Sequence, residues 1–115
     1  MEKEKKYTVK ITPEAEYYYY ELLEYLFKTH TPEKVDLKSN EIIDLAFTLE
    51  KYPYRGSVES KLDFLGKKHR YLLYTVTQRK DVKILYIIDE HKRIVYVVDF
   101  FGTEMDDNQI KKRNM

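Results

Sequence analysis

Two stretches decide the fold: Val82-Lys-Ile-Leu-Tyr-Ile-Ile-Asp89 and Arg93-Ile-Val-Tyr-Val-Val-Asp-Phe-Phe101. Both are rich in the β-branched and aromatic residues that favour strands. Only the polar residues Glu90–Lys92 separate them, and a link that short joins antiparallel neighbours. A similar apolar run, Arg70–Thr77, precedes them across the polar break Gln78–Asp81. Together these runs predict a three-stranded antiparallel meander.

The residues before the meander predict one more strand and two helix starts. Tyr7–Ile11 alternates apolar and polar residues, as a short strand does. Thr12-Pro13-Glu14 and Thr31-Pro32-Glu33 are each typical of a helix start. Threonine caps the first N–H groups, proline fits the first helical position, and glutamate complements the positive helix end.

The two helices are expected to form a hairpin. The first should run from Pro13 to about Lys28 and the second from Pro32 to about Lys51, where Pro53 ends it. Because the link between them is only two or three residues long, they should pack antiparallel.

The expected order is therefore β-α-α-β-β-β, an α+β fold with the helical hairpin on one face of a mainly antiparallel sheet. The 115 residues should form a single domain, residues 1–115. Val58–Lys68 has no clear pattern. The polar ends, 1–6 and about 106–115, are expected to be tails, the second of them either a frayed helix or disordered.

The meander is apolar on both faces, whereas an antiparallel sheet usually keeps one face polar. With Ile88 placed opposite Val95, one face carries Ile84, Tyr86, Ile88, Val95 and Val97, and the other carries Lys83, Leu85, Ile87, Ile94, Tyr96, Val98 and Phe100. Two helices can cover only the first face. The C-terminal tail, Val58–Lys68 or another chain must cover the second, and we expect a protein partner there. The predicted contacts are Leu85, Ile87, Tyr96, Val98 and Phe100.

Composition excludes several classes of protein. The chain has no cysteine, so disulfides, thiolate metal sites and cysteine nucleophiles are excluded. The three histidines have no metal-ligand spacing, and we expect neither a metal nor a cofactor. The charged first residues are unlike a signal peptide, and no apolar run is long enough to span a bilayer. A soluble cytoplasmic protein that does not contact membranes is the expectation.

Charge is distributed unevenly along the chain. Residues 1–54 hold 8 Lys/Arg and 11 Asp/Glu, whereas residues 55–115 hold 13 and 9, which gives −3 and +4 and a net charge of +1. A basic half favours nucleic acid or an acidic partner, although ordinary surface charge would look the same. The candidate nucleic-acid-binding residues are Lys67, Lys68, Arg70, Arg79 and Lys83. The alternative is that they are solvated charges at strand ends and turns.

Three stretches, taken in order, resemble the RelE/ParE toxin superfamily from Tyr7 to about Asp107. Tyr7-Thr-Val-Lys-Ile-Thr-Pro-Glu-Ala15 is similar to the family's first strand and first helix. Leu49-Glu-Lys-Tyr-Pro53-Tyr-Arg-Gly56 is similar to its helix end, and the two stretches quoted first resemble its signature hairpin. The resemblance implies a RelE/ParE-like fold. It also implies the toxin half of a two-gene toxin–antitoxin module, held inactive in a hetero-oligomer with a cognate antitoxin.

RelE-like members cleave mRNA on the ribosome, whereas ParE-like members block DNA gyrase. Metal-free RNA cleavage needs cations and a proton donor around the phosphate, and Arg70 and Lys83 are the catalytic candidates that this sequence retains. The family's arginine after the last strand is missing from Gly102-Thr-Glu-Met105, and no tyrosine follows Tyr96.

The resemblance is therefore closer to ParE-like members, which act by binding a protein target such as DNA gyrase. Two alternatives stay open: a ribosome-dependent mRNA endoribonuclease, and a degenerate, non-toxic module that only binds an antitoxin. Whether the protein is an enzyme is left undecided by these residues.

Overall fold

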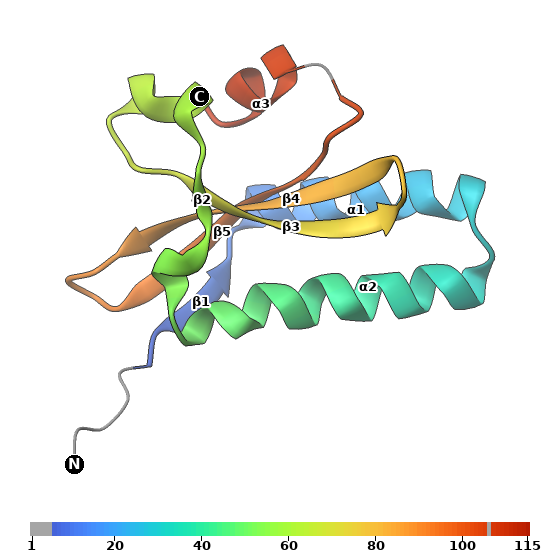
Figure 1. Ribbon diagram of the computed structural model, residues 1–115, viewed down its shortest axis with the longest axis horizontal. Coiled ribbons are helices and arrows are strands. Elements are labelled where there is room, and N and C mark those ends of the chain that lie inside the picture. Colours follow the sequence, from blue (N-terminus) through green and yellow to red (C-terminus); the bar gives the residue numbers. More distant parts are fainter. Residues whose placement is uncertain (1–5, 106) are drawn as a thin grey trace.

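A computed structural model describes residues 6–105 and 107–115 (Figure 1). The fold is α+β and is built on one five-stranded mixed sheet with the strand order β1-β5-β4-β3-β2. The strands are β1 (Thr8–Ile11), β2 (Ser57–Val58), β3 (Arg70–Thr77), β4 (Lys80–Asp89) and β5 (Ile94–Gly102). The predicted meander is confirmed, because β3, β4 and β5 pair antiparallel in that order. β1 joins the sheet parallel to β5, with Thr8 opposite Ile94.

The helical hairpin forms as expected. The helices are α1 (Pro13–Thr29) and α2 (Pro32–Phe47), and the chain continues from α2 into the short 3-10 helix η1 (Thr48–Glu50). Both predicted caps are present: the side chain of Thr12 accepts a hydrogen bond from the backbone N–H of Ala15 at 3.1 Å, and that of Thr31 accepts one from Lys34 at 3.3 Å. Within the described ranges, no helix is both long enough and apolar enough to cross a membrane.

The helix-side face of the sheet holds the main core. Apolar side chains of α1 and α2 pack there against alternate residues of β4 and β5, and the buried members include Leu26, Ile42, Ile84, Tyr86, Val95 and Val97. The expected assignment of residues to faces is confirmed up to Val98.

Phe100 is the exception to that assignment. The ladder shifts between Leu85 and Tyr86, which face Asp99 and Val97, so Val98 is an extra residue in β5. Such a bulge reverses the alternation after it. Phe100 therefore packs on Tyr19 of α1, with ring centroids 5.0 Å apart, and its predicted place on the second face is wrong.

Two segments of the same chain cover part of the second face. The 3-10 helix η3 (Ser60–Leu65) and the helix α3 (Asp107–Arg113) lie on the side of the sheet opposite α2 (Figure 1). They form a second, smaller core, whose buried members are Leu62, Leu85, Phe101 and Ile110. The C-terminal end and the Val58–Lys68 segment, the two alternatives to a partner, therefore cover part of this face, and a partner on the rest stays a prediction.

The predicted tails have different outcomes. Residues 107–113 form a helix that packs on the second face and buries Ile110. Residues 1–5 lie outside the described part of the chain, and so does residue 106.

A tight turn fixes the loop that crosses from η1 to β2. The hydroxyl of Tyr86 donates a hydrogen bond to the carbonyl of Pro53 at 2.6 Å and accepts one from the N–H of Gly56 at 3.1 Å. A Cβ atom at residue 56 would collide with the Tyr86 hydroxyl. Glycine is required here because the backbone approaches a buried side chain so closely.

Candidate functional site

The uncovered part of the second face forms a hollow of about 570 Å³, which we call the basic hollow. Ile87 and Tyr96, which face each other across β4 and β5, contribute its apolar surface. Its rim is formed by three basic residues that are nearly consecutive in the sequence, Lys67, Lys68 and Arg70. The full lining is Tyr54, Lys67, Lys68, Arg70, Ile87, Ile88, Asp89, Glu90 and Tyr96.

Lys67 and Lys68 supply the available positive charge of the basic hollow. They lie in the link between η3 and β3, just after Gly66, whose positive φ of 76° ends η3. Both side chains are exposed. No ion pair is found for either ammonium group among residues 6–105 and 107–115. These two charges are therefore free to meet an anionic group on a ligand or partner.

Arg70 has a structural task as well as a place at the rim. Its Nη1 donates hydrogen bonds to the carbonyl oxygens of Tyr54 at 3.1 Å and Gly56 at 2.9 Å. Its guanidinium also lies over the Tyr54 ring, 5.4 Å from the centroid. Because three contacts fix the guanidinium, Arg70 anchors the turn before β2 and adds positive potential at the rim.

Glu90 lines the basic hollow at the β4–β5 turn, where two tyrosine hydroxyls bind its carboxylate. The hydroxyls of Tyr7 and Tyr54 donate to Oε1 of Glu90 at 2.7 and 2.6 Å. The hydrogen bond to Glu90 raises the pKa of Tyr54 to about 12. The Tyr54 hydroxyl therefore stays protonated at neutral pH and serves as a hydrogen-bond donor rather than as a base.

Lys83 and Arg79 are not part of the basic hollow. The ammonium of Lys83 lies 2.6 Å from Oε1 of Glu59 and 4.4 Å from the centroid of the Tyr71 ring. Glu59 is almost fully buried, so the pair is held against the sheet and its charges cancel. Arg79 is exposed in the β3–β4 turn, at the opposite end of β3 from Arg70. Of the five predicted nucleic-acid-binding residues, the structure brings only Lys67, Lys68 and Arg70 together.

Of the five predicted partner contacts, some line the uncovered surface and others are buried within the chain. Ile87 and Tyr96 are half-buried and line the basic hollow. Val98 is half-buried and lies in an adjoining cavity beside Ile87 and Lys67. Leu85 lies under η3 and α3, and Phe100 lies in the helix-side core, so neither can contact a partner. The prediction of a partner contact is wrong for these last two residues.

The sequence did not predict the ion pairs that hold η3 and α3 against the second face of the sheet. Glu59 holds Lys83, and Arg113 of α3 holds the fully buried Asp99, with Nη2 and Oδ1 2.6 Å apart. The guanidinium of Arg113 also stacks on the Tyr18 ring at 3.8 Å. The only signal for α3 was Ile110, the single aliphatic residue in a polar stretch.

The chemistry available in the basic hollow favours recognition. Its lining combines an apolar patch, two free ammonium groups and tyrosine hydroxyls, the mixture that is typical of an interface. No cluster of three or more His, Asp or Glu side chains that could hold a metal ion is found in the described ranges. Lys83, one of the two catalytic candidates, is neutralised outside the hollow, and Arg70 is committed to backbone carbonyls.

Comparison of the chain with protein-family models, curated proteins and solved structures finds no match.

Proposed function

We propose that this chain is the toxin half of a two-gene toxin–antitoxin module, that it acts by binding a protein target rather than by cutting RNA, and that a cognate antitoxin neutralises it. The order of the main elements supports the proposal, because β1, α1, α2, β3, β4 and β5 follow the β-α-α-β-β-β order that the RelE/ParE resemblance implies for residues 7–107. The two-residue strand β2 and the helix α3 are additions to that order. The observation that carries it is the basic hollow, an apolar sheet surface left uncovered beside two free lysines.

The partner surface is smaller than an apolar sheet face alone implies, because the chain's own η3 and α3 occupy part of that face. The uncovered part still offers Ile87 and Tyr96, which are half-buried. Covering each of them would therefore contribute only part of the roughly 1.5–3 kcal/mol of a full burial. A partner that covers them needs acidic groups opposite Lys67 and Lys68, because buried lysines without counter-charges would weaken the complex.

Two contacts argue against the ribonuclease alternative. Cleavage would need a cation that faces the phosphate, but the Lys83 ammonium is paired with Glu59 at 2.6 Å. Past β5, Glu104 lies 3.5 Å from Lys80 and accepts a hydrogen bond from Tyr25 at 2.9 Å. A carboxylate therefore stands where the family carries an arginine after the last strand.

The test is to induce the chain alone in a bacterial host and to follow growth, DNA supercoiling and mRNA integrity. The expected result is growth arrest with intact mRNA and inhibited gyrase. Cleaved mRNA would support the ribonuclease, and unimpaired growth at a verified expression level would support the non-toxic module. Either outcome contradicts the proposal.

A pair of charge-reversal variants locates the active surface. Lys67→Glu with Lys68→Glu should abolish growth arrest, because it reverses the charge at the rim of the basic hollow. Lys111→Glu with Lys112→Glu is the matched control, since it reverses two adjacent exposed lysines on α3 and should leave arrest intact. Equal toxicity of both variants would exclude the basic hollow as the site.

A further inference from the structure

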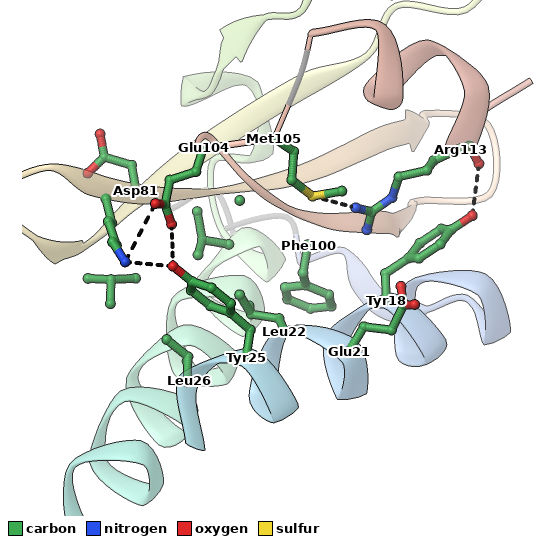
Figure 2. Close-up of a pocket in the computed structure, with 14 residues that line it drawn as sticks. Tyr18, Glu21, Leu22, Tyr25, Leu26, Asp81, Phe100, Glu104, Met105 and Arg113 are labelled. Carbon is green, nitrogen blue, oxygen red and sulfur yellow. Dashed lines mark hydrogen bonds and ion pairs between the residues drawn. The ribbon is translucent and has the colours of Figure 1, made fainter. Parts of the chain in front are cut away.

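A second cavity lies on the helix side of the sheet, away from the basic hollow. It has a volume of about 370 Å³ and opens between α1, the β3–β4 turn and the segment after β5 (Figure 2). This volume is at the lower end of the range of small-molecule sites, roughly 300–1,000 Å³. Its apolar lining consists of Leu22, Leu26, Val76, Val82 and Phe100.

Polar contacts close one end of this cavity. The ammonium of Lys80 donates to the Tyr25 hydroxyl at 2.6 Å, and that hydroxyl donates to Oε1 of Glu104 at 2.9 Å. Lys80 also pairs with Glu104 at 3.5 Å. Figure 2 shows Tyr25 and Glu104 joined at this end of the cavity. The positive charge of Lys80 is therefore already matched by a carboxylate.

The C-terminal helix closes the other end. Nη1 of Arg113 donates to the sulfur of Met105 at 3.0 Å, and the Tyr18 hydroxyl donates to the backbone carbonyl of Arg113 at 3.4 Å (Figure 2). The guanidinium charge of Arg113 is matched by Asp99 at 2.6 Å. With both ends closed by side chains, the cavity has room for a small molecule but not for a continuous peptide.

One charged group at the mouth has no partner. Glu21 lies on α1 between Tyr18 and Tyr25, and it lines the cavity. No hydrogen bond or ion pair is found for its carboxylate among the residues that the structure describes. Asp81 lines the same cavity from β4. The carboxylate of Asp81 is directed away from the cavity, because the neighbouring Val82 packs in the helix-side core (Figure 2). Since the two cations at the cavity are each paired with a carboxylate, Glu21 leaves the mouth negative, and an anionic ligand would be repelled.

From this charge pattern we propose that the cavity binds a small apolar amine, with the alkyl or aromatic body on Leu22, Val82 and Phe100 and the ammonium group at Glu21. The ammonium would donate charge-assisted hydrogen bonds to the carboxylate, which are roughly twice as strong as neutral ones. The site is independent of the proposed function, because its lining shares no residue with the basic hollow.

The test uses three probes of similar size that differ in charge: phenethylamine, phenethyl alcohol and phenylpropionate. Each is titrated into the full chain and followed by proton–nitrogen correlation NMR. Phenethylamine should shift the amide signals of Leu22, Val82 and Phe100 and bind about tenfold more tightly than the alcohol, since one charge-assisted hydrogen bond is involved. Phenylpropionate should not bind. Equal or tighter binding of the acid, no binding of any probe, or shifts confined to other residues would overturn the proposal.

Two variants and a control assign the contacts. Glu21→Gln should lower the affinity for phenethylamine to that for the alcohol. Glu24→Gln is the control and should leave both affinities unchanged, because Glu24 is exposed on α1 outside the cavity. Gly102→Leu should block the amine and the alcohol. Residue 102 faces Val82 across the ladder, and a Cβ there meets no atom within 4 Å. The dispersion of the NMR spectrum verifies that each variant is folded. Unchanged amine binding by Glu21→Gln or by Gly102→Leu would contradict the assigned site.

Discussion

The two faces of the sheet are equally apolar in sequence, but they are covered in different ways. The helix-side face is buried by two long amphipathic helices over a continuous core. The second face is covered only in part, by a 3-10 helix and a seven-residue helix. Of the four buried apolar side chains of this smaller core, Leu62 and Ile110 come from the two helices, and Leu85 and Phe101 come from the sheet. Each of these short segments is also tied to the sheet by an ion pair, Glu59 with Lys83 and Asp99 with Arg113.

The difference shows how short segments can cover an apolar sheet. A helix of seven residues is too short to be stable alone and buries little area, so its position depends on a few specific contacts. We therefore expect damage to the helix-side face to unfold the whole domain, and damage to the second face to release its cover while the sheet remains.

Alanine substitutions of two adjacent phenylalanines should give the largest change in stability and compare the two faces directly. Phe100 lies in the helix-side core and Phe101 in the smaller core, both almost fully buried. Phe100→Ala should lower the free energy of global unfolding by about 3–5 kcal/mol, because it leaves a cavity in the main core. Phe101→Ala should cost less, because its effect is limited by the free energy of releasing α3 and η3.

Urea denaturation measures the first quantity and amide hydrogen exchange the second. In Phe101→Ala, exchange should accelerate in α3 while the central strands β4 and β5 remain protected. If both variants lost the same global stability and exchanged uniformly, the two cores would be one cooperative unit, and the distinction drawn between the faces would be wrong.

The next effect concerns the ion pair that holds α3. Asp99→Asn leaves the Arg113 guanidinium buried without its counter-charge, and a lost charged hydrogen bond costs about 1.5–3 kcal/mol. The loss should appear as faster exchange of the α3 amides. Asp81→Asn is the control, because Asp81 also lies on a strand but is only half-buried. Similar exchange in both variants would show that the Asp99–Arg113 contact does not hold the helix.

The pair between Glu59 and Lys83 should have a smaller effect. Lys83→Met would cost roughly 1–2 kcal/mol, less than the loss of Asp99, because the Lys83 side chain keeps 16% of its surface in solvent. The same variant should retain the growth arrest expected of the wild type, since its charge is committed to Glu59. Loss of arrest in a variant that denaturation shows to be folded would restore Lys83 as a functional residue.

Local signals in the sequence predicted most of the fold. The two Thr-Pro-Glu starts gave the helix caps correctly, since a cap depends on neighbouring residues alone. The pairing of Ile88 with Val95 was also predicted, because a short turn fixes the register of a hairpin. The parallel pairing of β1 with β5 was not, since no local residue pattern encodes contacts between distant strands.

The errors in the candidate site have two physical sources, which are the bulge in β5 and the segments that cover the second face. Phe100 was misplaced because the bulge at Val98 leaves no mark in an apolar run. The burial of Leu85 could not be predicted, because the helix that covers it, α3, has only a weak signal in the sequence. The position of α3 depends on a single apolar residue, Ile110, and on the Asp99–Arg113 contact. The basic group at the rim could be predicted because its members, Lys67, Lys68 and Arg70, are nearly consecutive. The ion pair that neutralises Lys83 could not be predicted, because its partner Glu59 lies 24 positions away in the sequence.

The smallest expected effect is a pH dependence of the folding stability, which arises from a histidine on the second face. The imidazole of His69 is almost fully buried next to Glu59, with Nδ1 3.3 Å from the carbonyl of Lys67. Burial lowers the pKa of His69 below its ordinary value of 6.5. The unfolded chain therefore takes up this proton at a higher pH than the folded chain does, so stability falls as the pH drops through 6.5. Burial raises the pKa of Asp99, a group that contributes with the opposite sign, so the contribution of His69 requires a comparison of variants.

Urea denaturation of matched histidine variants, from about pH 7.5 to about pH 5.5 on either side of the ordinary histidine pKa, isolates this contribution. His69→Gln should lose less stability than the wild type over that interval, because the group that resists protonation is gone. His91→Gln, at an exposed position in the β4–β5 turn, should follow the wild type. Hydrogen exchange at the acidic end should locate the wild-type loss at η3 and the start of β3, which pack around His69. If the loss instead lay in α1 and α2, acid would be weakening the helix-side core, and the two faces would not differ in their sensitivity to pH.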